Sequence, residues 1–519
     1  MARRSLKYNA AVLTATGFVV KAIGFVYRIF IANSIGSEGL GLYQLVTPIY
    51  SLIVLVLTAG VSIAVSRFVA EEISRGLERS GMRITSVAAG LVMAVGGIVC
   101  LVLLVFLDPL VLSFTGDART RVSLFWTLAL IPPIAAASAY KGYFYGRQEM
   151  FPNAIGQIGE QIIKLVFVLL FFDRFKGQGI ESMCLLATLG LLVGEFANVL
   201  IVFIAFRFAR RKRSLNTSLQ PERKRVIVRR LCKTAVPIST NRLILSSIGT
   251  AESLLIPKRL LLFGLTFQES LENFGRLTGM AAPLVFFPSM LPMALATALV
   301  PAIAGAVASG RYAVANRQIS QSIRLTLVVG LIFTSFFAVC SQEISELVFP
   351  GKQVGPILHL LSYTGVFLYL QQTMLGILNG LGKESAILVN TLAGSILRLA
   401  LIWFLIPIMG VDAYIYAVIA GSLIVIVLNF RQIIKITGMS LDVGEWLVKP
   451  LVATLAGSVL ALLLKKIPML AGFDGKLGML LAVGLALVII VGAFAVGGIV
   501  KKEDLKRWAG KNAMLYDFL

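Results

Sequence analysis

Long apolar runs separated by short polar turns recur from one end of the chain to the other. A helix needs about 20 apolar residues to cross the hydrocarbon core of a bilayer, and most of these runs are that long. The pattern predicts an all-α polytopic membrane protein of about fourteen transmembrane helices. We expect these spans near residues 9–32, 44–66, 85–106, 122–144, 157–173, 183–206, 234–257, 282–308, 325–340, 355–380, 385–408, 412–430, 450–464 and 477–499.

Composition and charge agree with this interpretation and add an orientation. Of the 519 residues, 58% are hydrophobic and only 14% are charged, and the mean hydropathy is +0.89. A net charge of +23 would suggest nucleic acid in a soluble chain, but in a membrane protein Lys and Arg collect in cytoplasmic loops. With the N-terminus inside, 32 of the 48 basic residues fall on the cytoplasmic side and 11 on the outer side. The sequence therefore predicts a multi-pass protein of the cytoplasmic membrane with both termini cytoplasmic.

The two halves of the chain resemble each other at an offset of 234 residues. At this offset Gly76 matches Gly310, Gly142 and Gly146 match Gly376 and Gly380, and Lys164 matches Arg398. Agreement at a constant offset indicates an internal duplication. We expect an N-terminal lobe of six spans (1–206), a basic cytoplasmic linker (207–233), a second six-span lobe (234–435), and a final pair of spans with a basic cytoplasmic tail (436–519).

Repeats of six spans keep the same orientation in the membrane. The two lobes should therefore be related by a pseudo-two-fold axis along the membrane normal. Transporters built in this way bind their substrate between the lobes and rock to alternate access.

Several ionisable residues interrupt the apolar runs. A charged group in the bilayer centre costs at least about 2.5 kcal/mol, so each one needs a partner or a wet cavity. Five bases against three acids predict a cationic interior, which suits an anionic ligand such as a diphosphate. The bases are Lys21, Arg28, Lys164, Arg242 and Arg398, and the acids are Glu160, Glu195 and Glu252.

Other roles for these residues stay open. Arg28 could snorkel to the headgroups, and Glu160 and Lys164, four residues apart, could form a structural ion pair. Glu252 could neutralise a base or titrate with a coupling ion. Polar residues such as Gln157 and Asn390 could line the cavity or bond neighbouring helices.

The motifs of several enzyme classes are missing from the sequence. It contains no GxxxxGK[ST] loop, no GxSxG and no HExxH, and its single histidine, His359, has no second metal-ligand type clustered near it. The four cysteines are widely spaced and predict packing residues. We expect no catalytic residues, no metal site and no cofactor, and a coupling ion, Na⁺ or H⁺, stays open.

Four segments resemble a known family. They are KAIGFVYRIFIANSIGSEGLGLYQLVTPIY in span 1 and its exit, KGYFYGRQEMFPNAIGQIGEQIIKL after span 4, FPSMLPMALATALVPAIAGAVASG in span 8, and KKEDLKR near the C-terminus. Together they resemble the stage V sporulation protein B / polysaccharide biosynthesis protein family. This family belongs to the multidrug/oligosaccharidyl-lipid/polysaccharide (MOP) exporter superfamily, which also holds the lipid II flippases.

The resemblance implies a V-shaped bundle of two lobes around a cationic cavity, with Lys21 and Arg28 lining it. The match for Arg242 and Glu252 in span 7 is less direct. The implied cargo is an undecaprenyl-diphosphate-linked cell-wall precursor, a lipid II-like peptidoglycan intermediate, moved by alternating access, with a role in spore cortex synthesis as a further family inference. The implied partners are this lipid-linked glycan, the lipid bilayer and cell-wall synthesis enzymes, and no nucleic acid.

Three other functions compete with the flippase hypothesis. A cation-coupled multidrug exporter of the same fold should have an acidic cavity for cationic cargo, which the count of interior charges disfavours. A non-transporting scaffold for wall-synthesis enzymes would not need the two bases in span 1. A membrane glycosyltransferase would need external carboxylates, and Asp108 and Asp117 show no catalytic arrangement.

Overall fold

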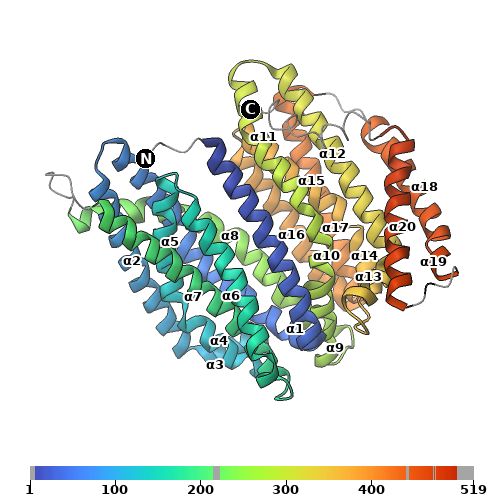
Figure 1. The fold of residues 1–519 in the computed structure, drawn as a ribbon, viewed down its shortest axis with the longest axis horizontal. Coiled ribbons are helices and arrows are strands. Elements are labelled where there is room, and N and C mark those ends of the chain that lie inside the picture. Colours follow the sequence, from blue (N-terminus) through green and yellow to red (C-terminus); the bar gives the residue numbers. More distant parts are fainter. Residues whose placement is uncertain (1–5, 214–222, 440–443, 471–472, 474, 500–519) are drawn as a thin grey trace. The chain divides into compact units, whose positions relative to one another are not determined.

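The computed structural model describes residues 6–213, 223–439, 444–470, 473 and 475–499. Within these ranges every regular element is a helix (Figure 1). The chain divides into two compact units, Met1–Leu254 and Leu255–Leu519. The all-α architecture predicted from the apolar runs is therefore confirmed.

The first unit is built from eight α-helices, the last of which extends into the second unit. They are α1 (Leu6–Ser74), α2 (Glu78–Val105), α3 (Leu107–Leu110), α4 (Arg121–Ala129), α5 (Ile131–Gly146), α6 (Phe151–Phe175), α7 (Ile180–Arg213) and α8 (Lys224–Leu262). A π-helical turn (Val111–Thr115) and a 3₁₀ turn (Ala118–Thr120) connect α3 to α4.

The second unit contains the remaining α-helices. They are α9 (Phe267–Phe274), α10 (Ala282–Phe286), α11 (Met290–Ala308), α12 (Tyr312–Val339), α13 (Ser341–Val348), α14 (Gly355–Ser362), α15 (Gly365–Gly380), α16 (Glu384–Met409), α17 (Val411–Thr437), α18 (Lys449–Leu464), α19 (Ile467–Leu470) and α20 (Gly475–Val496). Short π- or 3₁₀-helical turns at Gly275–Ala281, Phe287–Ser289 and Gly444–Val448 adjoin α9, α10, α11 and α18.

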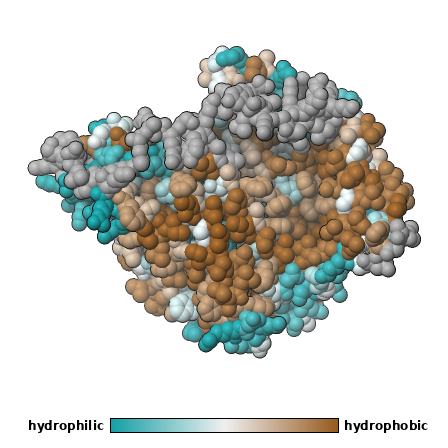
Figure 2. Space-filling model, viewed as in Figure 1, coloured by the Kyte–Doolittle hydropathy of each residue, from teal (hydrophilic) through white to brown (hydrophobic). Residues whose placement is uncertain are grey.

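Ten helical stretches of the described residues are long and apolar enough to cross a membrane, or eleven if the bent pair α4–α5 counts as one span. Each predicted span falls on helical residues, but two of them share α1, another falls on the short helices α14 and α15, and another falls on α8. The chain is therefore a multi-pass membrane protein, while the count of fourteen stays a prediction. In Figure 2, apolar side chains cover most of the face in view, and polar residues gather along its lower edge.

Helix α1 contains two predicted spans because the chain changes direction at Gly36, the one interior residue of this helix with non-helical dihedral angles (φ 73°, ψ 179°). A positive φ costs glycine little and strains most other residues. Close to this break in sequence, Glu38 accepts a hydrogen bond from Arg119 (2.8 Å), which also pairs with Asp117 (2.8 Å). The ion pairs connect the segment after the break to the turn before α4.

Much of the segment predicted as a linker is helical. Helix α7 continues through Arg213 and α8 begins at Lys224, because Lys and Arg are good helix formers and a helix can extend beyond the membrane. Residues 214–222 of the predicted linker and the basic tail 500–519 lie outside the described residues. The boundary between the two compact units falls within α8, and the predicted lobe boundaries stay a prediction.

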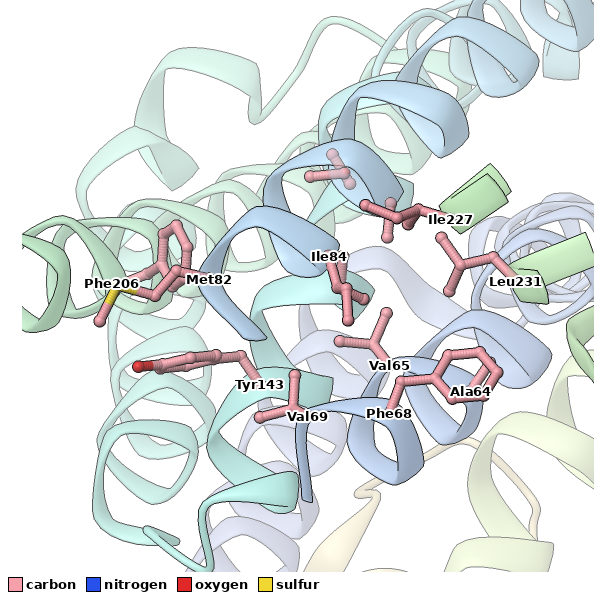
Figure 3. Close-up of a cluster of buried hydrophobic side chains, with 14 of the residues drawn as sticks. Ala64, Val65, Phe68, Val69, Met82, Ile84, Tyr143, Phe206, Ile227 and Leu231 are labelled. Atoms are coloured by element: carbon pink, nitrogen blue, oxygen red, sulfur yellow. The ribbon is translucent and has the colours of Figure 1, made fainter. Parts of the chain in front are cut away.

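A buried apolar cluster holds the first unit together (Figure 3). Val65 and Phe68 of α1 pack with Ile84 of α2, Tyr143 of α5 and Phe206 of α7. From α8, the cluster also includes Ile227, Leu231 and Ala235. The start of α8 is therefore part of the core of the first unit.

The second unit repeats contacts of the first at the predicted offset of 234. A Cβ built on Gly142 would lie 2.6 Å from the Ser62 carbonyl oxygen, and one built on Gly376 would lie 2.5 Å from the Ala296 carbonyl oxygen. Glycine lets the two backbones approach this closely. Both residues of the second pair follow those of the first by 234 positions, so α11 packs on α15 as the second half of α1 packs on α5.

Two further contacts repeat at the same offset. A Cβ on Gly146 would lie 3.0 Å from Val69 Cβ, and one on Gly380 would lie 3.0 Å from Ile303 Cβ. A Cβ on Gly96 would lie 3.3 Å from Pro132 Cα, and one on Gly330 would lie 3.0 Å from Val366 Cα. Three matched contacts, made by helix pairs of separate units, support the internal duplication inferred from the sequence.

The last helices pack on α12 and α13, at one side of the second unit. The Lys465 ammonium, just after α18, pairs with Glu343 (2.8 Å) and donates to the Val339 carbonyl oxygen (2.6 Å). Arg324 of α12 donates to the Ile499 carbonyl oxygen (2.8 Å). These bonds attach the final helix pair to the second unit.

Candidate functional site

Charged and polar side chains predicted to be functional come together in the first unit, where α1, α6 and α7 pack on one another. Glycine allows α6 and α7 to approach closely: a Cβ on Gly194 of α7 would lie 2.7 Å from the Glu160 carbonyl oxygen and 2.9 Å from Lys164 Cβ. Glu160 and Lys164 therefore lie at a point where the two helices approach each other closely.

Two side-chain amides hold the Glu160 carboxylate. Asn198 of α7 donates its Nδ2 to Oε2 at 2.7 Å, and Gln161 donates its Nε2 to Oε1 at 3.1 Å. Hydrogen bonds to a charged acceptor stabilise it more than bonds between neutral groups do. Glu160 therefore has neutral donors, and it forms no direct ion pair with Lys164.

The Lys164 ammonium lies over an aromatic ring. Its Nζ is 4.3 Å from the centroid of Tyr27, and only 8% of the residue is exposed. The face of the ring attracts a cation, and this attraction is stronger where water is excluded. The Tyr27 hydroxyl in turn donates to the Ala187 carbonyl oxygen of α7 at 3.4 Å, so the ring stands between α1 and α7.

Four charges of the first unit interact around this point. Lys164 interacts electrostatically with Glu160, Glu195 and Arg28, and Arg28 interacts with Tyr27 and Tyr43. The cluster contains two bases and two acids, so their formal charges balance. The cluster itself is therefore less cationic than the count of interior charges predicts.

Three polar atoms at the cluster are buried and have no hydrogen-bond partner among the described residues. They are the Tyr50 hydroxyl, Gln161 Oε1 and Asn198 Oδ1. Tyr50 interacts electrostatically with both Glu195 and Glu160. A buried polar atom without a partner is costly, so such atoms commonly mark a position where water or an ion binds.

The other predicted site residues of the first unit are placed differently. Lys21 and Gln157 are half-buried, on α1 and α6. Arg242 and Glu252 lie ten residues apart on α8, and Arg242 is exposed whereas Glu252 is only 7% exposed. The two residues therefore lie in different environments, one exposed and one buried.

The second unit contains Arg398 and Asn390, both on α16. A Cβ on Gly421 of α17 would lie 3.0 Å from Arg398 Cβ, which matches the contact of Gly194 with Lys164 in the first unit. Asn390 donates its Nδ2 to Asn429 Oδ1 at 2.8 Å, between α16 and α17. Each repeat thus places one base at the same helix–helix contact, and Asn390 bonds a neighbouring helix.

Sequence reasoning gave no role to the tyrosines of this cluster, Tyr27, Tyr43 and Tyr50. Their hydroxyl groups within apolar runs were a usable signal, because a buried tyrosine hydroxyl usually has a partner. Asn198 is a further residue of the cluster whose role only the fold shows, because its partner Glu160 lies on another helix.

Comparisons with known proteins identify the class to which this membrane protein belongs. A model of the family "Polysaccharide biosynthesis protein" matches residues 6–306, more than half of the chain, and a MatE model matches residues 278–404. The chain is a transporter of the MOP exporter superfamily. It belongs to the polysaccharide biosynthesis protein family.

Relatives match over nearly the whole chain. Stage V sporulation protein B of Bacillus subtilis (strain 168) is 26% identical over 514 residues, which cover 98% of both chains. The lipid II flippase MurJ of the same organism is 26% identical over 94% of this chain and 93% of its own. A solved structure of the lipid II flippase MurJ, in an inward closed conformation, has a TM-score of 0.66 at 13% identity and covers 94% of this chain and 99% of its own. The resemblance predicted from the four segments is confirmed.

Proposed function

We propose that this protein moves an undecaprenyl-diphosphate-linked cell-wall precursor, a lipid II-like peptidoglycan intermediate, across the cytoplasmic membrane by alternating access. The observation that carries the proposal is the full-length similarity to a sporulation protein and to a lipid II flippase. Similarity to the sporulation protein supports the further proposal of a role in spore cortex synthesis. The protein acts as a transporter and makes or breaks no covalent bond of its cargo.

Basic residues on α1 are the candidates for holding the diphosphate. Lys21 and Arg28 are two helical turns apart, so they lie on one face of the helix, and both are half-buried. Guanidinium and ammonium groups bind phosphate oxygens by charge-assisted hydrogen bonds. In this proposal Lys164 and Arg398 supply further positive charge, one from each repeat.

The orientation is part of the proposal. Helices α1 and α11 end next to basic connections that contain Arg75, Arg79 and Arg311, and α7 and α8 carry Arg207 to Arg230. Lys and Arg are enriched in cytoplasmic loops, so these ends face the cytoplasm and both termini lie on that side.

Translocation of fluorescent lipid II in proteoliposomes tests the proposal. The wild type should flip the lipid, and Lys21→Ala/Arg28→Ala should reduce the rate at least tenfold. The matched control is Arg174→Ala/Lys176→Ala, which removes the same charge from exposed positions and should flip normally. Absence of flipping by a folded wild type, with a potential and ion gradients imposed, would contradict the assignment of this cargo.

The acid cluster is our candidate for ion coupling. Glu160 and Glu195 lie near the buried, unpartnered oxygens of Gln161 and Asn198, and oxygen donors of this kind suit either Na⁺ or a proton on a carboxylate. Glu160→Gln should remove the dependence of flipping on an imposed gradient of the coupling ion. A variant that keeps this dependence would exclude Glu160 from the role.

Two observations favour the second candidate, a cation-coupled exporter of small molecules. The MatE model matches residues 278–404, and the balanced charges around Lys164 leave room for a cationic cargo. Efflux of a cationic dye from cells that produce the wild type, but not the Glu160→Gln variant, would support this function.

A further inference from the structure

Near the end of α8, the guanidinium group of Arg259 lies on the ring of Trp403 from α16. The guanidinium carbon is 3.1 Å from the centre of the ring. Both residues belong to the second unit, so they are separate from the Glu160–Lys164 cluster of the first unit. We call these two residues the Arg259–Trp403 pair.

The guanidinium group of this pair has unused hydrogen-bond donors. Its Nη2 is buried, and the group donates no hydrogen bond to any residue that the structure describes. A guanidinium has five N–H donors in a planar fork, and a buried donor without an acceptor costs free energy. The face of the Trp403 ring attracts the positive charge, but it is not the oxygen acceptor that these N–H groups require.

The acids near these helix ends in the sequence do not pair with Arg259. Glu252 lies two helical turns earlier on α8, about 10 Å along the axis. Glu269 caps the start of α9, and Glu272 pairs with an arginine of the turn that follows α9. Asp412, in the first turn of α17, is exposed and forms no ion pair within the described parts of the chain. No described carboxylate therefore neutralises the guanidinium by direct contact.

The first unit balances a base on an aromatic ring in a different way. Lys164, which also lies over a ring, interacts electrostatically with Glu160 and Glu195. At the offset of 234, the positions of these two acids are occupied by Gly394 and Asn429. The second repeat therefore has no acid at either position, and an anion from outside the chain can supply the missing charge.

The Arg259–Trp403 pair lies near the ends of two predicted membrane spans. Arg259 is two residues beyond the span 234–257, and Trp403 lies in the last two turns of the span 385–408. Tryptophan is enriched at this level of a bilayer, where the lipid headgroups begin. Trp403 is 48% exposed and Arg259 is half-buried, so a molecule of the surrounding membrane can reach the pair.

We propose that the Arg259–Trp403 pair binds the phosphate group of a membrane lipid. The ring positions the guanidinium, and the N–H groups of its fork donate charge-assisted hydrogen bonds to phosphate oxygens. Leu262, one turn after Arg259, and Phe404, next to Trp403, are both exposed and offer apolar surface to the lipid chains.

Two lipids carry a suitable phosphate. On the proposed orientation the pair lies at the outer end of the second unit. The ligand is then a phospholipid of the outer leaflet or the diphosphate-bearing cargo after it has crossed. Only the choice of leaflet and the second of these lipids rest on the proposed function.

Fluorescence of Trp403 gives a local test in the full-length protein. Replacing the other tryptophans with phenylalanine (Trp126→Phe/Trp446→Phe/Trp508→Phe) makes Trp403 the only source of the signal. The protein is reconstituted in vesicles that contain brominated phosphatidylglycerol or brominated phosphatidylcholine, because bromine quenches a tryptophan that it contacts. If a phospholipid is the ligand, phosphatidylglycerol should be preferred at Trp403 by about tenfold, and Arg259→Gln should remove this preference.

Undecaprenyl diphosphate identifies the other source of phosphate. If the cargo is the ligand, added undecaprenyl diphosphate should protect Trp403 from brominated phosphatidylcholine, and Arg259→Gln should remove this protection. If Trp403 shows neither the preference nor the protection, the pair binds no lipid phosphate and the proposal is wrong. Arg259→Lys keeps the charge without the planar fork, so it should lose most of the effect, and an effect equal to that of the wild type would also contradict the proposal.

Lys466→Gln is the matched control. Lys466 is exposed and follows Lys465, which contacts the end of α12. Helices α9–α11 cross the membrane once and α12 returns, so Lys466 and Arg259 lie on the same side. An exposed charge away from the pair contributes little, so this variant should change the preference or the protection by less than about twofold. Equal effects of Lys466→Gln and Arg259→Gln would mean that only general surface charge matters, and they would overturn the proposal.

A flipping assay separates this proposal from the proposed function. A wild type that does not flip lipid II but prefers phosphatidylglycerol at Trp403 would contradict the cargo and leave the phosphate site in place. A wild type that flips lipid II but shows neither effect at Trp403 would contradict the phosphate site alone.

Discussion

The Glu160 carboxylate accepts a hydrogen bond from the Asn198 amide at 2.7 Å, across the contact between α6 and α7. Replacing Asn198 with Leu should destabilise the protein by about 1–3 kcal/mol, because a mostly enclosed carboxylate loses its shorter hydrogen bond. Chemical unfolding of the detergent-solubilised protein measures the loss.

Glu160→Gln provides the second side of a double-mutant cycle with Asn198→Leu. A hydrogen bond between the two side chains predicts a coupling of at least about 0.5 kcal/mol. Additive effects would show that Asn198 acts by packing and that the bond contributes nothing.

The ring of Tyr27 should matter more than its hydroxyl. Tyr27→Phe keeps the surface under Lys164 and loses one long hydrogen bond, so it should cost no more than about 1 kcal/mol. Tyr27→Leu also removes the cation–π contact and should cost about 2 kcal/mol more. Thermal unfolding of the wild type and the two variants measures these costs. Equal losses of stability in Tyr27→Phe and Tyr27→Leu would rule out a role for the ring.

Glycine-to-alanine changes at the repeated contacts should be costly in both units. Gly142→Ala and Gly376→Ala each place a Cβ within 2.6 Å of a backbone oxygen and should destabilise the protein by about 1–3 kcal/mol. The controls are Gly90→Ala and Gly305→Ala, in helices with open space around them, which should be neutral or slightly stabilising. If the unfolding curves of these two variants match those of the two controls, the close approach of the helices does not contribute to stability.

Arg119 should stabilise the segment after the Gly36 break. Its ion pairs reach Glu38 and Asp117, whose side chains are 12% and 6% exposed, so Arg119→Met leaves two enclosed carboxylates without their base. We expect a loss of about 1–3 kcal/mol in the free energy of unfolding. Adding Glu38→Gln should recover part of it, and a further loss instead would show that Arg119 is not the partner that matters.

The apolar runs were sufficient to predict the all-α fold, because the length of an apolar run can be read from neighbouring residues alone. The same is true of the duplication: the glycine pairs at an offset of 234 mark backbone contacts that the structure repeats. Short or divided helices limited the count of spans. Helix α1 joins two predicted spans through Gly36, and α8, which contains the predicted span 234–257, is not among the ten described helices that are apolar enough to cross a membrane.

The site was less accessible from the sequence, because its contacts join residues far apart in the chain. The spacing of Glu160 and Lys164 suggested a local ion pair, yet Glu160 binds Asn198, 38 positions away, and Lys164 lies on Tyr27, more than 130 positions away. Both partners come from other helices. A local pattern on α6 contains no information about the faces of α1 and α7 that meet it.

The repeated glycine contacts imply a particular history of divergence. At the repeated contacts both halves have the same glycine, as in Gly142 and Gly376, while the residue that the glycine meets differs, as in Ser62 and Ala296. The close approach between the helices is therefore common to the two halves, while the side chains around it differ. A duplicated gene that is constrained in this way can change the side chains of one half without changing the helix packing. The two halves of a carrier can then make different contacts with the same cargo.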